Sequence, residues 1–185
     1  MRKNFGQKTW MYPLPVLIVG TYDDEGCADA MNAAWGGIYD YNKVILCLSS
    51  GHKTTKNIKL KGAFTISFAD AGHVEAADYV GIVSANDTKD KMERAGFHAV
   101  KSEFVDAPVF DELPVALECK LIKFNEDGNI IGEIVNVSAD ERVLGADGLI
   151  DADKLQPISY DPVRNDYLLV GKKVGDAFSA GAGLK

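Results

Sequence analysis

The segment of residues 49–57, SSGHKTTKN, has the residue types that bind a phosphate group. Thr54 and Thr55 fall at the start of a predicted helix, where unpaired backbone N–H groups and the helix dipole attract an anion. Lys53 and Lys56 add positive charge beside them. The segment therefore predicts a phosphate site, although a threonine that only caps the helix, with solvated lysines, would leave the same pattern.

Two flanking side chains are weaker candidates for the same phosphate. Asn57 lies one helical turn further along and is placed to reach the phosphate or the chain attached to it. His52 offers another donor, and a histidine in a surface loop is its alternative interpretation.

A second segment, residues 31–37 (MNAAWGG), combines small residues with one large indole. Small residues let a planar heterocycle approach the backbone closely. Backbone N–H groups near four small residues are candidate donors to such a ring: Ala33, Ala34, Ser49 and Ser50. The Asn32 amide adds a donor, and Trp35 either packs beside the ring or is an aromatic of the core or of a dimer interface. Together the two segments predict a nucleotide-like cofactor.

Composition limits the class of protein. A chain of 185 residues with 46% hydrophobic and 25% charged residues predicts one domain over residues 1–185. The formal net charge of −7 argues against nucleic acid or an anionic membrane surface as a partner, because both need a basic face. No apolar run approaches the ~18–20 residues of a membrane span, and no signal-peptide core follows the basic N-terminus. We therefore expect a cytoplasmic protein.

The cysteines and the catalytic motifs are mainly informative by what they lack. Three cysteines without CxxC spacing, and without a histidine at ligand spacing, predict reduced, mostly buried thiols and no metal site. Cys47, inside the apolar run VILCL, fits a core strand better than a catalytic thiol. The sequence has no GxGxxG, GxxxxGK[ST], HExxH or GxSxG motif, so no module for a permanently bound dinucleotide is predicted. No residue is nominated as a catalytic acid or base.

The elements that must position these residues are mostly strands. Runs of strand formers predict strands over residues 16–22, 27–34, 44–48, 63–68, 115–124 and 130–137, with a last strand region within 157–171. Helices are predicted over 54–61, 74–83 and 89–95. Several strands without regular βαβ alternation favour an antiparallel barrel carrying helices, an α+β fold, over a doubly wound sheet.

In order and spacing, these segments resemble the flavin reductase-like family of FMN-binding split barrels, and within it the flavoredoxin-like branch. The matching residues extend over nearly the whole chain: PLPV at 13–16, NAAW at 32–35, SS at 49–50 with Thr54 and Asn57, ADYVG at 77–81, DKM at 90–92, GF at 96–97, AP at 107–108, LEC at 117–119 and PISY at 157–160. The resemblance implies a mainly β, six-stranded antiparallel split β-barrel with flanking helices. It further implies a homodimer that binds FMN near the subunit interface.

The resemblance also selects site residues. The implied cofactor-binding set is Asn32, Ala33, Ala34, Trp35, Ser49, Ser50, His52, Lys53, Thr54, Thr55, Asn57 and Lys91. Lys91 would bring its charge to the phosphate from its own or the other subunit, and a solvated helix face is the alternative. Asp78 and Tyr79 would lie near the flavin. His73 is a candidate for contacting a nicotinamide, but an exposed loop histidine fits its context better.

The function implied by this resemblance is that of an FMN-binding oxidoreductase of the flavin reductase type, with NAD(P)H as transient electron donor. Hydride transfer from a nicotinamide to a flavin requires orientation of two planar rings more than a protein acid or base. The alternative is a flavoredoxin-type electron carrier that keeps its FMN and passes electrons to a redox partner protein. A third interpretation is a non-enzymatic flavin-binding protein.

Overall fold

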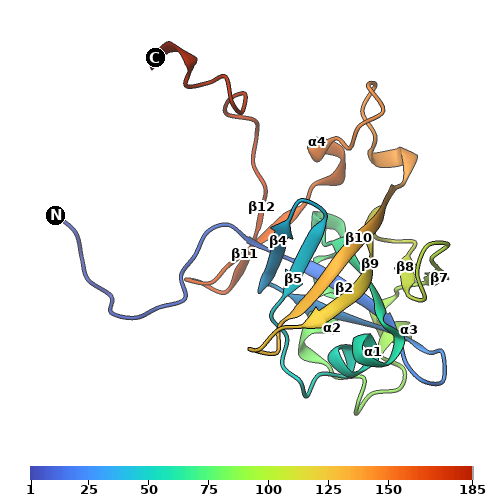
Figure 1. The fold of residues 1–185 in the computed structure, drawn as a ribbon. Coiled ribbons are helices and arrows are strands. Elements are labelled where there is room, and N and C mark those ends of the chain that lie inside the picture. Colours follow the sequence, from blue (N-terminus) through green and yellow to red (C-terminus); the bar gives the residue numbers. More distant parts are fainter. Residues whose placement is uncertain (185) are drawn as a thin grey trace.

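A curled antiparallel sheet forms the body of the molecule in the computed structural model, which describes residues 1–184 (Figure 1). Its seven strands, in sheet order, are β3 (Ala28–Ala33), β2 (Leu17–Tyr22), β6 (Ala63–Phe68), β9 (Val115–Phe124), β10 (Ile130–Ala139), β5 (Lys43–Leu46) and β4 (Gly36–Asp40). Every neighbouring pair is antiparallel. The sheet makes a half-barrel, so the predicted split-barrel fold is confirmed, with one strand more than the six expected.

Strand β2 shows how the sequence builds the core. Successive side chains of a strand point to opposite faces of the sheet, and here both faces are covered. On one face, Ile18 packs in an apolar cluster with Val80 of the helix over residues 74–82. On the other face, Leu17 and Val19 pack in a second cluster with Phe64. Because both faces are buried, β2 reads as a continuous apolar run instead of an alternating one.

The additional strand β4 was not predicted. Residues 36–40 fold back on β5, with Gly36 opposite Leu46, and they lie at the edge of the sheet, where most of their side chains are exposed. An exposed edge strand has no apolar run to reveal it in the sequence. Strand β5 also ends at Leu46, two residues earlier than predicted.

The helices lie close to their predicted positions. They are α1 (Lys53–Lys61), α2 (Val74–Ile82) and α3 (Lys91–Ala95), whereas the short α4 (Ala152–Leu155) was not predicted. Helix α1 ends at Gly62, which adopts the left-handed conformation at φ 66° and donates its N–H to the Ile58 carbonyl at 2.9 Å. This is the helix end predicted from the glycine.

Two smaller sheets and two arms complete the chain. The small sheets are β1 (Leu14–Pro15), β11 (Ile158–Asp161) and β12 (Asp166–Leu169), and β7 (Ala99–Lys101) with β8 (Pro108–Phe110). The 3₁₀ turns are Ala71–His73, Glu141–Val143 and Ala182–Leu184. Residues 1–11 and 171–184 run away from the body as two extended arms (Figure 1).

Candidate functional site

A cleft of about 470 Å³ opens where the end of β3 meets α2 and the β11–β12 pair. Its lining comes from four parts of the chain: Met31, Asn32, Ala33, Ala34 and Trp35; Cys47, Leu48 and His52; Asp78, Gly81 and Ile82; and Tyr160, Asn165 and Tyr167. The predicted ring-binding residues 32–35 therefore lie together on one wall. Trp35 stands at the rim with 54% of its surface exposed.

A smaller cavity of about 170 Å³ adjoins the cleft and shares His52, Met31 and two residues of α2 with it. Charged side chains are more numerous in its walls than in those of the cleft: Asp29, Lys53 and Lys91 line it, together with Thr54. The structure thus places an apolar cleft and a small charged cavity side by side, and His52 borders both.

The N-terminus of α1 is part of this smaller cavity. His52 occupies the N-cap position without a capping side-chain hydrogen bond, and the first turn has no acidic residue. The first intrahelical bond joins the Lys56 N–H to the His52 carbonyl at 3.2 Å. The preceding backbone N–H groups of the helix therefore stay available to an anion. The alternative that Thr54 or Thr55 caps the helix is wrong for the described structure.

A buried ionic network forms part of the wall of the smaller cavity. Lys91 Nζ donates to Asp29 Oδ1 at 3.0 Å and to the Ala30 carbonyl at 2.6 Å. The Thr54 hydroxyl donates its proton to Asp29 Oδ2 at 2.9 Å. Both charged side chains are at most 4% exposed, so the solvated-face interpretation of Lys91 is wrong. An ammonium group has three donors, which leaves Lys91 one beyond these two bonds.

Several other predicted phosphate residues have their side chains engaged within the protein. The Thr55 hydroxyl donates to the Ser49 carbonyl at 2.8 Å, and the buried Asn57 amide donates to the Thr21 hydroxyl at 3.0 Å. Lys53 Nζ lies 3.3 Å from Asp23 Oδ2. Among the lining residues of the two cavities we find neither Ser49, Ser50, Thr55 nor Asn57 in the described chain.

A second polar network lies in the wall of the cleft itself. The Tyr167 hydroxyl donates to Asp78 Oδ1 at 2.8 Å, and the Asn32 amide donates to the Ala77 carbonyl at 3.0 Å and to Tyr167 Oη at 3.4 Å. Burial, followed by the hydrogen bond and the charge of Asp78, raises the pKa of Tyr167 to about 12. Helix α2 approaches β3 closely at Gly81. A Cβ atom at this position would lie 3.0 Å from Asn32 Cβ, so a larger residue would press on Asn32.

One group of cleft residues that sequence reasoning missed comes from β11, β12 and the turn between them. Tyr160, Asn165 and Tyr167 line the cleft, and the Tyr160 hydroxyl donates to Asn165 Oδ1 at 2.8 Å. Tyr167 is 135 positions from Asn32, so no local motif links them. The sequence signals were the PISY match at 157–160, which ends at Tyr160, and the tyrosines of the last predicted strand region.

Two of the three cysteines are exposed, contrary to the expectation, and His73 lies away from the two cavities. Cys47 follows the end of β5, is exposed and lines the cleft, so its placement in a core strand was wrong. Cys27 is also exposed, and only Cys119 is buried. Burial raises the pKa of the Cys119 thiol to about 12. His73 lies outside both cavities, with Nδ1 2.8 Å from Asp70 Oδ1.

Two features are absent from residues 1–184. No helix there is long and apolar enough to cross a membrane. No group of His, Cys, Asp and Glu side chains in the same range is arranged to hold a metal ion.

Comparison with known proteins identifies related chains. The model of the flavin reductase like domain matches residues 9–159. The structure is similar to the flavoredoxin of Desulfovibrio vulgaris (Miyazaki F), with 41% identity, a TM-score of 0.94, and coverage of 98% of this chain and 100% of that one. It is similar to a flavoredoxin from Methanosarcina acetivorans, with 25% identity, a TM-score of 0.90 and full coverage of both chains. An uncharacterized protein of Aeropyrum pernix is 26% identical over 81% of this chain, which spans only 58% of that relative.

Proposed function

The chain belongs to the flavin reductase-like family, and on this premise we propose that it binds FMN and acts as a flavin-dependent redox protein. The observation that carries the proposal is the pair of adjoining cavities, one with mainly apolar walls and one with charged walls. FMN has the same two parts, a planar ring system and a phosphate.

The residues of the two cavities fit this cofactor. Ala33, Ala34 and Leu48 offer apolar surface to a ring, and Trp35 stands at the open side of the same cleft. Lys53, Lys91 and the free N–H groups of α1 offer donors and positive charge to a phosphate. The Asp29 carboxylate balances Lys91, and Asp23 lies 3.3 Å from Lys53, so the helix terminus is left as the main attraction for a second negative charge.

Bound FMN would supply two-electron chemistry, accepting hydride from a donor and passing electrons to an acceptor. The protein's own residues would bind and orient the flavin. The Tyr167–Asp78–Asn32 network would hold the polar wall of the cleft in one arrangement. No side chain is required as an acid or base for this step.

The similarity to flavoredoxin favours an electron carrier that keeps its FMN and reduces a partner protein. NAD(P)H as the direct donor is the second candidate, and the open cleft supports it, because Ile82 and Trp35 leave its rim exposed to solvent. A homodimer with FMN near the subunit interface is part of the proposal. Exposed apolar side chains at the cleft, such as Trp35 and Ile82, support this dimer.

Spectroscopy of the purified protein tests the proposal. We expect the purified protein to show a flavin absorbance spectrum, or to retain one through gel filtration after FMN is added, with tighter binding of FMN than of riboflavin by titration calorimetry. Equal affinity for both would contradict the phosphate site, and no binding of either would contradict the function. Anaerobic mixing with NADH and NADPH then separates the two candidates: bleaching within seconds supports the reductase, and a flavin reduced only by dithionite or a partner protein supports the carrier.

A further inference from the structure

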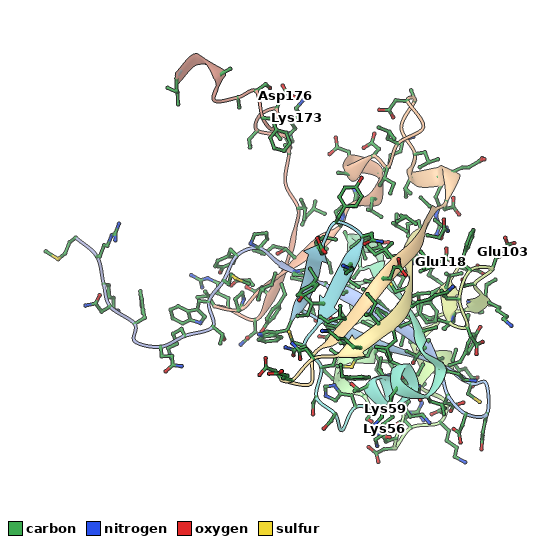
Figure 2. All side chains as sticks on the ribbon, viewed as in Figure 1. Lys56, Lys59, Glu103, Glu118, Lys173 and Asp176 are labelled. Carbon is green, nitrogen blue, oxygen red and sulfur yellow. The ribbon has the colours of Figure 1, made fainter. Side chains whose placement is uncertain are left out.

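The two terminal arms emerge from the same small sheet, beside the cleft. Residues 1–11 lead into β1, whose Leu14 pairs with the cleft residue Tyr160 of β11, and residues 171–184 follow β12. Both arms then run away from the body (Figure 1). Figure 2 shows Lys173 and Asp176 on the C-terminal arm, far from the labelled side chains of α1 and β9.

The contacts of each arm are internal to it. In the N-terminal arm the Phe5 and Trp10 rings are 5.2 Å apart, and the Met11 N–H donates to the Thr9 carbonyl. No hydrogen bond or ion pair of the described chain joins residues 1–11 or 171–184 to the body. An extended segment gains no burial in this arrangement to offset its ordering entropy.

Both the arms and one edge of the main sheet carry apolar side chains in solvent. Met11 is 63% exposed, and Phe178 of the other arm is fully exposed. Strand β4 ends the main sheet with one unpaired edge, and its Ile38 is 70% exposed. Exposed edges and contiguous apolar surface are typical of surfaces that another chain covers.

Charge favours a second copy of this chain as that partner. The first 22 residues carry Arg2, Lys3 and Lys8 and no acidic residue, which leaves 17 Lys and Arg against 27 Asp and Glu in the rest of the chain. A basic arm is therefore complementary to the acidic body of an identical molecule, and a two-fold axis satisfies both arms and both edges at once.

We propose that the arms are exchanged in the dimer, each packing against the β4 side of the partner subunit. This inference rests on the dimer of the proposed function and names the segments that hold it together. The exchange does not depend on FMN, because the terminal arms, the edge of β4 and the charges that attract them are all parts of the protein.

Photo-crosslinking in a mixture of ¹⁵N-labelled and unlabelled chains tests the exchange. Benzoylphenylalanine replaces Trp10, and a control places it at Lys59 on α1 (Figure 2). We expect the position 10 probe to give crosslinks between labelled and unlabelled chains, within residues 35–43, and the control to give none there. Crosslinks within one chain only, or none, would overturn the proposal.

Two variants provide an independent measurement of dimer mass by light scattering. Deletion of residues 1–11 and the triple variant Arg2→Glu, Lys3→Glu, Lys8→Glu should each weaken the dimer at least about tenfold while circular dichroism stays native. Unchanged dimerisation in both variants, or binding of the arm to phosphatidylglycerol vesicles in place of its partner, overturns the exchange. FMN content is measured separately. An exchanged dimer without FMN would refute the proposed function alone.

Discussion

The Nζ atom of Lys91 lies 3.0 Å from Oδ1 of Asp29, and the two buried side chains join α3 to β3 in the wall of the smaller cavity. The second oxygen of Asp29 accepts the Thr54 hydroxyl proton from α1. One carboxylate thus connects three elements around the proposed phosphate site, so the same residues have a structural role that can be separated from ligand binding.

Replacing Lys91 by Met should be strongly destabilising, because it leaves the Asp29 carboxylate buried without its partner. Loss of one member of a buried ion pair costs about 3–5 kcal/mol. Urea denaturation would measure the change in free energy of unfolding. The double variant Lys91→Met, Asp29→Asn should recover part of it. An unchanged urea midpoint in the single variant would show that the pair does not hold these elements together.

Thr54→Val should lower stability because it removes the hydrogen bond to Asp29, and a bond to a charged group contributes about 1.5–3 kcal/mol. Thr54→Ser should retain the bond and serves as the control. Because the only hydroxyl proton is already donated, FMN affinity of the folded variant should change little. A large loss of FMN affinity at unchanged stability would instead assign that proton to the phosphate.

Lys53→Gln should weaken binding of FMN and leave riboflavin unaffected, because Lys53 lines the smaller cavity at the start of α1. A partly exposed charge contributes about 1 kcal/mol, which corresponds to about fivefold in Kd. Lys59→Gln, in the last turn of the same helix, is the matched control and should have no effect. Titration calorimetry with FMN and with riboflavin measures the two affinities. An equal loss of affinity for riboflavin would argue against a phosphate contact.

The raised pKa of Tyr167 predicts that the free energy of unfolding falls at alkaline pH. Its pKa is raised from 10.0 to about 12 by burial and by Asp78. The folded state therefore holds the phenolic proton more tightly than the unfolded chain does, and the resulting stability is present below about pH 10 and lost as pH rises towards 12. Tyr167→Phe should show a smaller drop in urea midpoint between pH 9 and 11.5 than wild type. Tyr160→Phe, whose hydroxyl bonds the Asn165 amide, should keep the full drop.

The three thiols should differ in reactivity. At pH 8, Cys27 and Cys47 should react with a thiol reagent, whereas the buried Cys119, with its raised pKa, should react only after unfolding. Because Cys47 lines the cleft, FMN should slow its modification and leave that of Cys27 unchanged. Peptide mass spectrometry would identify the sites. Equal protection of both thiols, or of neither, would contradict the placement of FMN in the cleft.

Local signals in the sequence predicted most of the fold. Strand β9 and the end of α1 at Gly62 follow from apolar runs and from a glycine that accepts positive φ, which are properties of neighbouring residues. Residues 32–35 lie together in the wall of one cleft, and their contact with a cofactor stays a prediction. Strand β4 escaped prediction because an exposed edge strand needs no apolar run.

The partners of polar side chains were decided by tertiary structure alone. Nothing near Lys91 in the sequence indicates Asp29, which is 62 positions away, and Tyr167 reaches Asp78 across 89. The sequence determined the segments that face the two cavities, because residue type and spacing set helix starts and strands. Only the tertiary structure decided that Asp29 pairs with the Lys91 ammonium and the Thr54 hydroxyl, two groups that the sequence had assigned to a phosphate. The reason is that a hydrogen bond depends on which donors and acceptors the packed strands and helices bring within about 3 Å.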